Sequence, residues 1–211
     1  NLSALEAMSI GTAGITAAAS VIKIIDSKPS SQLPIIVTGA TGGVGSVAVM
    51  ILSKLGFDVS ALTGKPEAKN FLTQLGATSI IFREDYLNEP SKPMVRPLFA
   101  GAVDTVGGSI LSKLLSEISP HGVVSCCGNV GGIEINTTVF PFILRGINLC
   151  GIDSAESPIE FKESLWKKFA NEWRLDLSAS TKEVFKEQLG EEIQIILQGG
   201  QQGRVVLNHK E

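Results

Sequence analysis

The chain has 211 residues, of which 44% are hydrophobic and 18% charged, so we expect one large domain, or a domain and a further piece, with a substantial core. Its formal net charge of −3, without a basic cluster, argues against nucleic acid as the main partner. No uninterrupted apolar run reaches membrane-spanning length, because Lys23 and Asp26 interrupt the longest one, and no secretion signal is visible. We therefore expect no membrane partner and a cytoplasmic location.

The cysteines and histidines form neither a disulfide pattern nor a metal-binding pattern. Cys126, Cys127 and Cys150 lie in apolar, strand-like segments, where reduced thiols in a core are expected. His121 and His209 have no Cys or His near them at the spacing of metal ligands. The sequence therefore predicts no metal site.

The first predicted elements surround a glycine-rich turn. Residues 1–26 are predicted to be helical in two pieces that meet at the small residues of 10–16, and residues 27–34, with two prolines and three serines, form a loop. A short buried strand at 35–38 follows, and then a helix at 46–56 with a broad apolar face.

Gly39, Gly42 and Gly45 lie between this strand and this helix. Glycines let the backbone turn tightly and approach a ligand, and the free N–H groups at the start of the helix face an anion. Because a strand precedes the glycines and a helix follows them, the stretch is predicted to bind the phosphates of a dinucleotide.

The pattern of strand and helix then repeats along the chain. Further strands are predicted at 58–62, 79–82, 102–106, 122–127 and 147–152, helices at 67–75 and 109–118, and a loop with three prolines at 83–98. Because parallel strands need crossover connections, this alternation predicts an α/β fold, a Rossmann-type doubly wound parallel six-stranded sheet.

The C-terminal part departs from this alternation. Helices are predicted at 158–173 and 181–197, followed by a glycine-rich break and a last apolar strand at 205–207. That strand has no obvious neighbour in a six-stranded parallel sheet, so we expect it to pair with a domain missing from this sequence. We place the dinucleotide-binding domain at 1–154, and the C-terminal helices and terminal strand that pack on it at 155–211.

The end of the second predicted strand indicates which cofactor is bound. A site specific for NAD usually has Asp or Glu there to hold the ribose hydroxyls, whereas this chain has Thr63, Gly64 and Lys65. Glu67 falls in the first turn of the next helix, where acids are common for dipole reasons alone. Arg83 follows the third strand. A hydroxyl and two cations at strand ends favour the 2′-phosphate of NADPH, although the two cations could also be solvated surface charges.

Two other enzyme classes fit less well. The glycine turn also fits short-chain dehydrogenases, which need a tyrosine and a lysine four residues later, but Tyr86 is followed at that spacing by Pro90. A methyltransferase would normally have an acid where Thr63 stands.

Six motifs occur in one order along the chain: residues 10–16 (IGTAGIT), 37–45 (VTGATGGVG), 75–77 (LGA), 104–107 (DTVG), 141–145 (PFILR) and 151–154 (GIDS). Together they resemble the medium-chain dehydrogenase/reductase superfamily, in its zinc-independent quinone oxidoreductase and acrylyl-CoA reductase branch. Zinc-dependent relatives carry a ligand cysteine shortly before the Gly-Thr pair, where this chain has Met8, Ser9 and Ile10.

The resemblance implies a role at each matching position. It implies that the pyrophosphate is held by Thr41, Gly42, Gly43 and Val44, and the adenosine ribose phosphate by Thr63, Gly64, Lys65 and Arg83. It places Thr12, Asn129, Ile143 and Ser154 along the nicotinamide half, with Arg204 near the edge of the cofactor. Cys127 lies near the same edge, but no histidine is placed to activate it, so we interpret it as structural.

The resemblance also implies an activity and partners. The family transfers hydride from NADPH to an activated alkene, such as an acrylyl-CoA-like thioester or an enone, or to a quinone. Family members normally begin with a GroES-like barrel that closes over the nicotinamide, and this sequence opens at the helix that follows it, so no catalytic residue can be named. Relatives pair through the sheet edge, so we expect a homodimer through strand 147–152. The alternative is a stand-alone nucleotide-binding or sensing module without catalysis.

Overall fold

The computed structural model describes residues 2–29, 32–90 and 92–209, so residue 1 of the predicted first helix, residues 30–31 and 91 of two predicted loops, and residues 210–211 lie outside it. Six parallel strands form the central sheet in the order β3-β2-β1-β4-β5-β6, which confirms the predicted Rossmann-type fold. The strands are β1 (Ile35–Thr38), β2 (Val59–Thr63), β3 (Ser79–Phe82), β4 (Gly101–Asp104), β5 (Val123–Cys126) and β6 (Asn148–Gly151).

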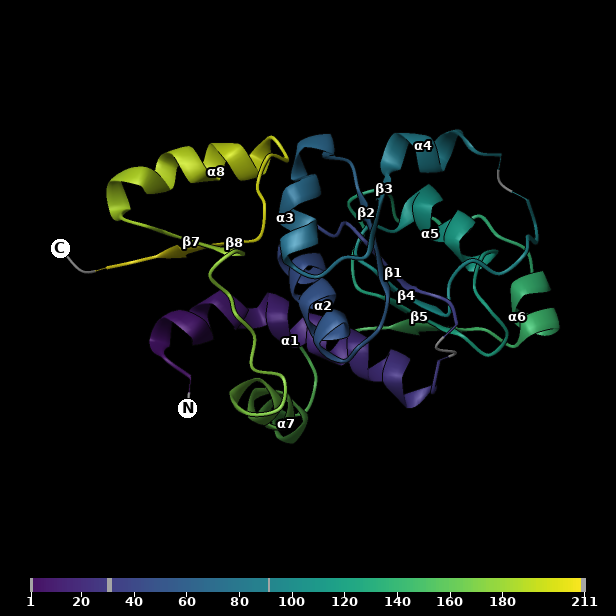
Figure 1. Ribbon diagram of the computed structural model, residues 1–211, viewed down its shortest axis with the longest axis horizontal. Helices are drawn as coiled ribbons and strands as arrows, with labels where there is room; N and C mark the ends of the chain where they lie inside the picture. The colour runs from purple at the N-terminus through teal and green to yellow at the C-terminus, as the bar shows by residue number, and fades with distance from the viewer. Residues whose placement is uncertain (1, 30–31, 91, 210–211) are drawn as a thin grey trace.

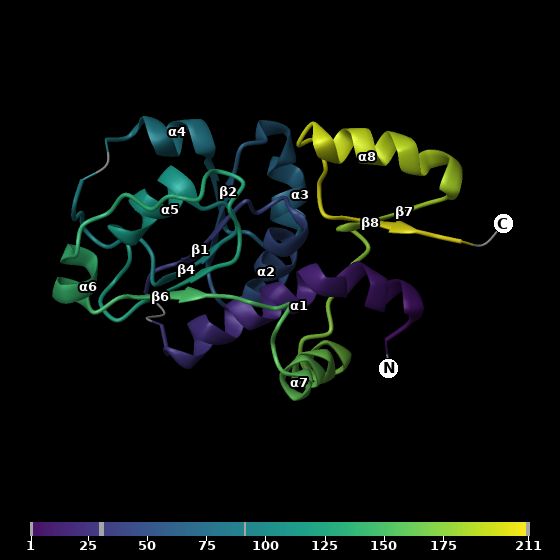
Figure 2. The ribbon, with the colours of Figure 1, turned by 180° about the vertical axis from the view of Figure 1, so that it is seen from behind.

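Helices cover both faces of this sheet (Figures 1 and 2). One buried core lies beneath α1 (Ala4–Asp26), α2 (Gly43–Lys54), α3 (Lys69–Gln74) and α7 (Ile159–Ala170). The other lies beneath α4 (Arg83–Asn88), α5 (Gly108–Leu115) and α6 (Phe140–Arg145). The β1 and β4 strands are buried throughout, as expected for parallel strands that are covered on both sides.

The first helix shows how local sequence signals shape the fold. Ser3 caps α1 in a reciprocal pair of hydrogen bonds with Glu6, at 3.2 Å and 2.7 Å. Gly11, with φ 48° and ψ −157°, kinks the helix within the junction predicted from its small residues. The two predicted helical pieces are therefore present and are joined at this glycine.

Helix α1 is the one described helix that is long and apolar enough to be compared with a membrane span. Helix α1 is 23 residues long, with a mean hydropathy of 1.6 in its most apolar window, so by length and composition it could cross a membrane. However, 61% of that window is buried inside the fold, where the helix packs against α2 and α7. Its apolar character is explained by the core that it builds.

The predicted loop at 83–98 is partly wrong, because α4 occupies its first part. Tyr86 on α4 is 5% exposed, and its hydroxyl donates a 2.5 Å hydrogen bond to Glu117. The Nζ atom of Lys113, on α5, lies 4.2 Å from the centre of the Tyr86 ring. Burial raises the pKa of Glu117 and of Tyr86. This buried cluster holds α4 against α5. The three prolines of the predicted loop all come after α4, so they do not interrupt it.

The predicted helix at 181–197 is also partly wrong. Its first residues form β7 (Thr181–Val184), a short 3₁₀ turn, η2 (Lys186–Gln188), follows, and the helix α8 covers only Leu189–Leu197. The last strand, β8 (Arg204–Leu207), pairs in parallel with β7, so it has a neighbour within this chain after all. Figure 1 shows this two-stranded unit and α8 at one end of the molecule, apart from the six-stranded sheet.

Candidate cofactor site

The turn between β1 and α2 is as tight as the glycine pattern predicts. Gly39 has a φ of 59°, and a Cβ atom there would lie 2.3 Å from the hydroxyl of Thr105. The Gly42 N–H donates to the Gly39 carbonyl at 2.9 Å. A Cβ on Gly45 would lie 2.3 Å from that carbonyl oxygen, so α2 approaches the turn at a distance that only glycine allows.

Helix α2 begins at Gly43, three residues earlier than predicted, with Gly42 as its N-cap. Among the described residues no side chain caps this end, so the first N–H groups of the helix, at Gly43 and Val44, remain available to a ligand. Thr41, 5% exposed, completes the turn. The uncapped helix end and the adjoining glycines can hold a pyrophosphate.

A buried carboxylate supports the turn from below. Asp104, at the end of β4, accepts hydrogen bonds from the Thr38 hydroxyl at 2.6 Å and from the Gly107 N–H at 2.9 Å. The Thr105 hydroxyl donates to the Thr38 carbonyl at 2.8 Å. Burial raises the pKa of Asp104 although these donors oppose the shift. Sequence reasoning missed this role, although an acid that ends a wholly apolar strand could have suggested it.

The predicted ribose-phosphate residues lie together at the ends of β2 and β3. The Arg83 guanidinium covers Gly64 so closely that a Cβ there would lie 2.8 Å from its Cζ atom. The Thr63 side chain is buried and accepts a hydrogen bond from the Lys65 N–H at 3.1 Å. These four residues line one cavity of about 400 Å³, next to Gly39 and Thr41 of the glycine turn. The two cations therefore face the same space.

Three of the four residues predicted for the nicotinamide half lie in two places. The Thr16 hydroxyl donates to the Thr12 carbonyl at 2.9 Å and lies 2.6 Å from the Ser154 hydroxyl, which joins α1 to the segment after β6. Asn129 lines a separate hollow at the ends of β5 and β6, together with Cys127. Burial raises the pKa of Cys127 to about 11, which leaves the thiol protonated and unreactive at neutral pH.

Ile143 is the predicted site residue that the structure does not bring to the others. It is 68% exposed on α6. Arg145 of the same helix donates to the carbonyls of Ser116 and Ile118, which precede β5, so α6 lies at the opposite ends of the strands. A contact of Ile143 with the cofactor has no support in this arrangement.

Arg204 joins the C-terminal strand to the cofactor site. Its Nε atom donates to the Ser9 carbonyl at 3.2 Å, beside the kink of α1. A Cβ on Gly43 would lie 2.9 Å from its guanidinium, and a Cβ on Gly11 would lie 3.2 Å away. Burial lowers the pKa of Arg204, which remains a cation at the start of α2.

A further set of site residues was missed. The residues between α8 and β8, 198–203, which we call the C-terminal loop, cross the glycine turn. The Gly203 N–H donates to the Thr41 carbonyl at 2.8 Å, and Gln198 and Gly199 line the same cavity as Lys65. The signal in the sequence is the cluster of Gly199, Gly200 and Gly203, which predicts a break in the chain but also allows a close approach to the glycine turn.

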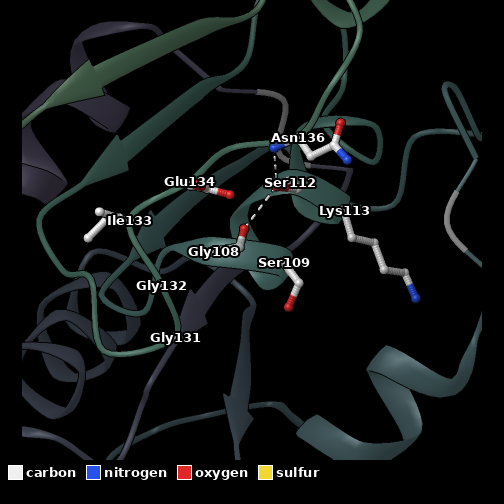
Figure 3. A pocket seen from close by; sticks show the side chains of 9 residues that line it. All are labelled: Gly108, Ser109, Ser112, Lys113, Gly131, Gly132, Ile133, Glu134 and Asn136. Carbon is white, nitrogen blue, oxygen red and sulfur yellow. Dashed lines mark hydrogen bonds between the residues drawn. The ribbon is translucent and has the colours of Figure 1, made fainter.

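A second hollow lies beside α5 (Figure 3). The Ser112 hydroxyl in it donates to the Gly108 carbonyl at 2.9 Å and accepts from the Asn136 N–H at 2.9 Å. Figure 3 shows the Lys113 side chain directed away from Glu134. Its Nζ atom donates a hydrogen bond to the Tyr86 carbonyl. The Ser112 hydroxyl is thus engaged within this hollow, and the Lys113 ammonium is engaged outside it.

Comparison with known families agrees with this geometry. The family model described as zinc-binding dehydrogenase matches residues 43–171, more than half of the chain, from the start of α2 through strands β2 to β6 to the end of α7. The chain belongs to this family. The chain is 44% identical to a putative quinone oxidoreductase and 40% identical to an acrylyl-CoA reductase, the two kinds of enzyme that the motifs resemble. In the described part of the chain, no group of three or more His, Cys, Asp or Glu side chains could hold a metal ion.

Three relatives illustrate the similarity. The putative quinone oxidoreductase YhfP of Bacillus subtilis is 44% identical over 98% of this chain, and its crystal structure with NAD bound matches with a TM-score of 0.93. The acrylyl-CoA reductase AcuI of Ruegeria pomeroyi is 40% identical over 96% of this chain. The structure of YhdH from Escherichia coli K-12 with bound NADPH matches 98% of this chain at 38% identity and a TM-score of 0.90. The chain spans 64%, 62% and 64% of these proteins, respectively.

Proposed function

We propose that this chain binds NADPH and forms the cofactor-binding part of an oxidoreductase that transfers hydride to an activated alkene, such as an acrylyl-CoA-like thioester, or to a quinone. The observation that carries the proposal is the single cavity shared by Lys65, Arg83 and the glycine turn. A phosphate-binding turn suits the pyrophosphate of NADPH, and two cations at neighbouring strand ends suit its 2′-phosphate.

Each half of the cofactor has a place in the proposal. The uncapped start of α2 binds the pyrophosphate through its N–H groups, and Arg204 adds a charge beside it. Thr12 and Ser154, held together through Thr16, position the nicotinamide ribose. When bound, NADPH supplies the hydride, and the residues of this chain orient it and keep its adenosine end fixed.

The structures of the relatives hold NADPH in one case and NAD in another, so the preference for NADPH rests on residues of this chain. The end of β2 carries no carboxylate that would hold the ribose hydroxyls, and it carries Lys65 instead. Arg83 stacks over Gly64 at the same point. A carboxylate would repel a 2′-phosphate, whereas two cations attract it.

The rest of the proposed enzyme follows from the family. A GroES-like domain would close over the nicotinamide and carry most substrate contacts, and β8 with β7 lies at the end of the molecule where such a domain could continue the sheet. We further propose catalysis without zinc in the cytoplasm, and a homodimer through β6, which is an edge of the six-stranded sheet.

Thermal unfolding tests the proposed binding. A ligand that binds the folded state at a hundred times its dissociation constant adds about 2.7 kcal/mol to the stability. NADPH should therefore raise the unfolding temperature of the chain by several degrees, on the order of 2–4 °C per kcal/mol, and NADH at equal concentration should raise it less. No shift with either cofactor would contradict the proposal.

A further inference from the structure

The C-terminal loop contacts both phosphate-binding parts of the site. Its last residue, Gly203, donates to the Thr41 carbonyl in the glycine turn at 2.8 Å. The carbonyl of Gln201, in the middle of the loop, accepts a hydrogen bond from the Lys65 ammonium. The loop is held at its end by the Arg204 N–H, which donates to the Ser180 carbonyl at 2.7 Å. The loop therefore bridges the glycine turn and Lys65, at the end of β2.

The bond to Gln201 fixes the otherwise flexible side chain of Lys65. A lysine ammonium has three donors, and the carbonyl uses one of them. Lys65 also lines the cavity of Thr63, Gly64 and Arg83, so its other two donors are left for a ligand there. A side chain that is already held in position loses less conformational entropy when it binds an anion.

We infer that the C-terminal loop is a positioning element of the cofactor site, which holds Lys65 toward the 2′-phosphate and so increases the preference for NADPH. This inference rests on the proposed function. It assigns part of the specificity to residues 198–203, which lie far in sequence from the strand ends that carry the charges. Loosening the loop should weaken binding of the 2′-phosphate without removing any charge.

Gly199 offers a way to loosen the loop, and Gly56 offers a matched control. Each glycine ends a helix with a positive φ, 73° at Gly199 and 84° at Gly56, and a Cβ at either one would meet no atom within 4 Å. Both helix ends have the same pair of backbone hydrogen bonds. After α8 the N–H groups of Gly199 and Gly200 donate to carbonyls of the last turn, and after α2 the N–H groups of Gly56 and Phe57 do so. Alanine therefore costs about the same backbone strain at both positions, but only Gly199 adjoins the site.

The experiment compares two small probes that differ only in the 2′-phosphate, adenosine 2′,5′-bisphosphate and 5′-AMP. Their dissociation constants are measured by calorimetry for the wild type, Lys65→Ala, Gly199→Ala, the double variant and Gly56→Ala. We expect Gly199→Ala to reduce the preference for the bisphosphate about fivefold, through the strain of a left-handed alanine. Gly56→Ala should leave the preference unchanged, and Gly199→Ala should add nothing in the Lys65→Ala background.

Each other outcome has a distinct meaning. If Lys65→Ala lowers the preference for the bisphosphate but Gly199→Ala leaves it unchanged or raises it, the inference is overturned. The proposed function still stands in that case. Equal affinity of the wild type for both probes would instead contradict the proposed function. If Gly199→Ala does not fold, hydrogen exchange of the wild type decides: the bisphosphate should slow exchange at the Gly203 N–H more than 5′-AMP does, and equal protection would overturn the inference.

Discussion

Lys65 and Arg83 reach one cavity from the ends of two neighbouring strands, and this convergence is the chemical basis of the proposed specificity. Lys65 is fixed by the Gln201 carbonyl, and Arg83 lies flat over Gly64. A planar guanidinium and a compact ammonium can contact different oxygens of one phosphate. The two charged side chains thus differ in shape, and they come from the ends of different strands, β2 and β3.

Removing one of these cations should weaken NADPH selectively. A charge-assisted contact to phosphate contributes about 1.5–3 kcal/mol, so Lys65→Ala should weaken NADPH about tenfold or more and leave NADH nearly unchanged. Calorimetric titration with both cofactors measures this. Lys54→Ala, which removes an exposed charge at the far end of α2, serves as the control. Equal losses for the two cofactors in Lys65→Ala would refute the assignment.

Cys127 lies near the nicotinamide side of the site but is expected to be inert. Burial raises its pKa from the ordinary 9.0 to about 11. At pH 8 it should therefore hold roughly a hundredfold less thiolate than an ordinary thiol, and its alkylation by iodoacetamide should be slower by about that factor. The rate, followed by mass spectrometry, should rise with pH up to about 11. Rapid alkylation at neutral pH would show that the thiol is activated.

At the scale of elements, strand β1, the glycine turn and α2 form one unit whose close packing depends on Gly45. A Cβ there would lie 2.3 Å from the Gly39 carbonyl and 2.8 Å from the Ala40 Cα, both of them backbone atoms that cannot move independently. Asp104 holds the same turn from below. The rigidity of the proposed phosphate site is therefore set by backbone packing and by one buried carboxylate.

Gly45→Ala should displace the turn. We expect a loss of about 1–3 kcal/mol of stability from the overlap, and a weakening of NADPH binding by at least about tenfold because the N–H groups no longer converge. Gly190→Ala is the matched control, since a Cβ in this helix meets nothing within 4 Å and alanine favours helix by about 0.5–1 kcal/mol. Chemical unfolding and titration compare the two variants, and unchanged binding in Gly45→Ala would contradict the packing argument.

The elements that could be predicted are those whose signals are local. The glycine turn and the alternation of apolar strands with helices fixed the sheet, because a parallel arrangement leaves few alternatives. The segment at 181–184 was mistaken for helix because its strand character arises from pairing with β8, twenty residues later. The C-terminal loop was missed as a site for the same reason: its contacts with Thr41 and Lys65 join residues distant in sequence.

At the scale of the whole molecule, β6 is an edge strand of the main sheet, and apolar side chains of α6 lie next to it in sequence. Phe140, Ile143 and Leu144 are 45%, 68% and 64% exposed. An exposed apolar surface beside the unpaired edge of a strand favours association with another copy. This gives Ile143 an explanation other than the cofactor contact that the resemblance implied.

Leu149→Lys, in the middle of β6, should therefore convert a dimer into a monomer. Leu149 is half-buried and packs against the core beneath α5, so chemical unfolding must first show that the variant folds. A charge beside the proposed interface then opposes pairing through repulsion and desolvation. Sedimentation at micromolar concentration measures the change, and Leu87→Lys, at an exposed leucine on α4, is the control that should stay dimeric. A monomeric wild type would contradict the proposal.

These 211 residues alone are expected to turn over substrate negligibly. Hydride transfer requires the substrate to be held against the nicotinamide with water excluded. In the proposed enzyme a GroES-like domain supplies most of the substrate contacts. NADPH absorbance followed in the presence of acrylyl-CoA or a simple quinone should therefore not fall faster than in a blank. Full-rate turnover would show that the catalytic groups lie in this chain.

The central claim is that the cavity formed by the glycine turn, Lys65 and Arg83 binds NADPH and prefers it to NADH. The most direct measurement is a calorimetric titration of the wild-type chain with each cofactor under the same conditions. We predict that NADPH binds about tenfold more tightly or better, since the 2′-phosphate adds at least one charge-assisted contact. Equal affinity for the two cofactors, or no binding of either, would contradict this account.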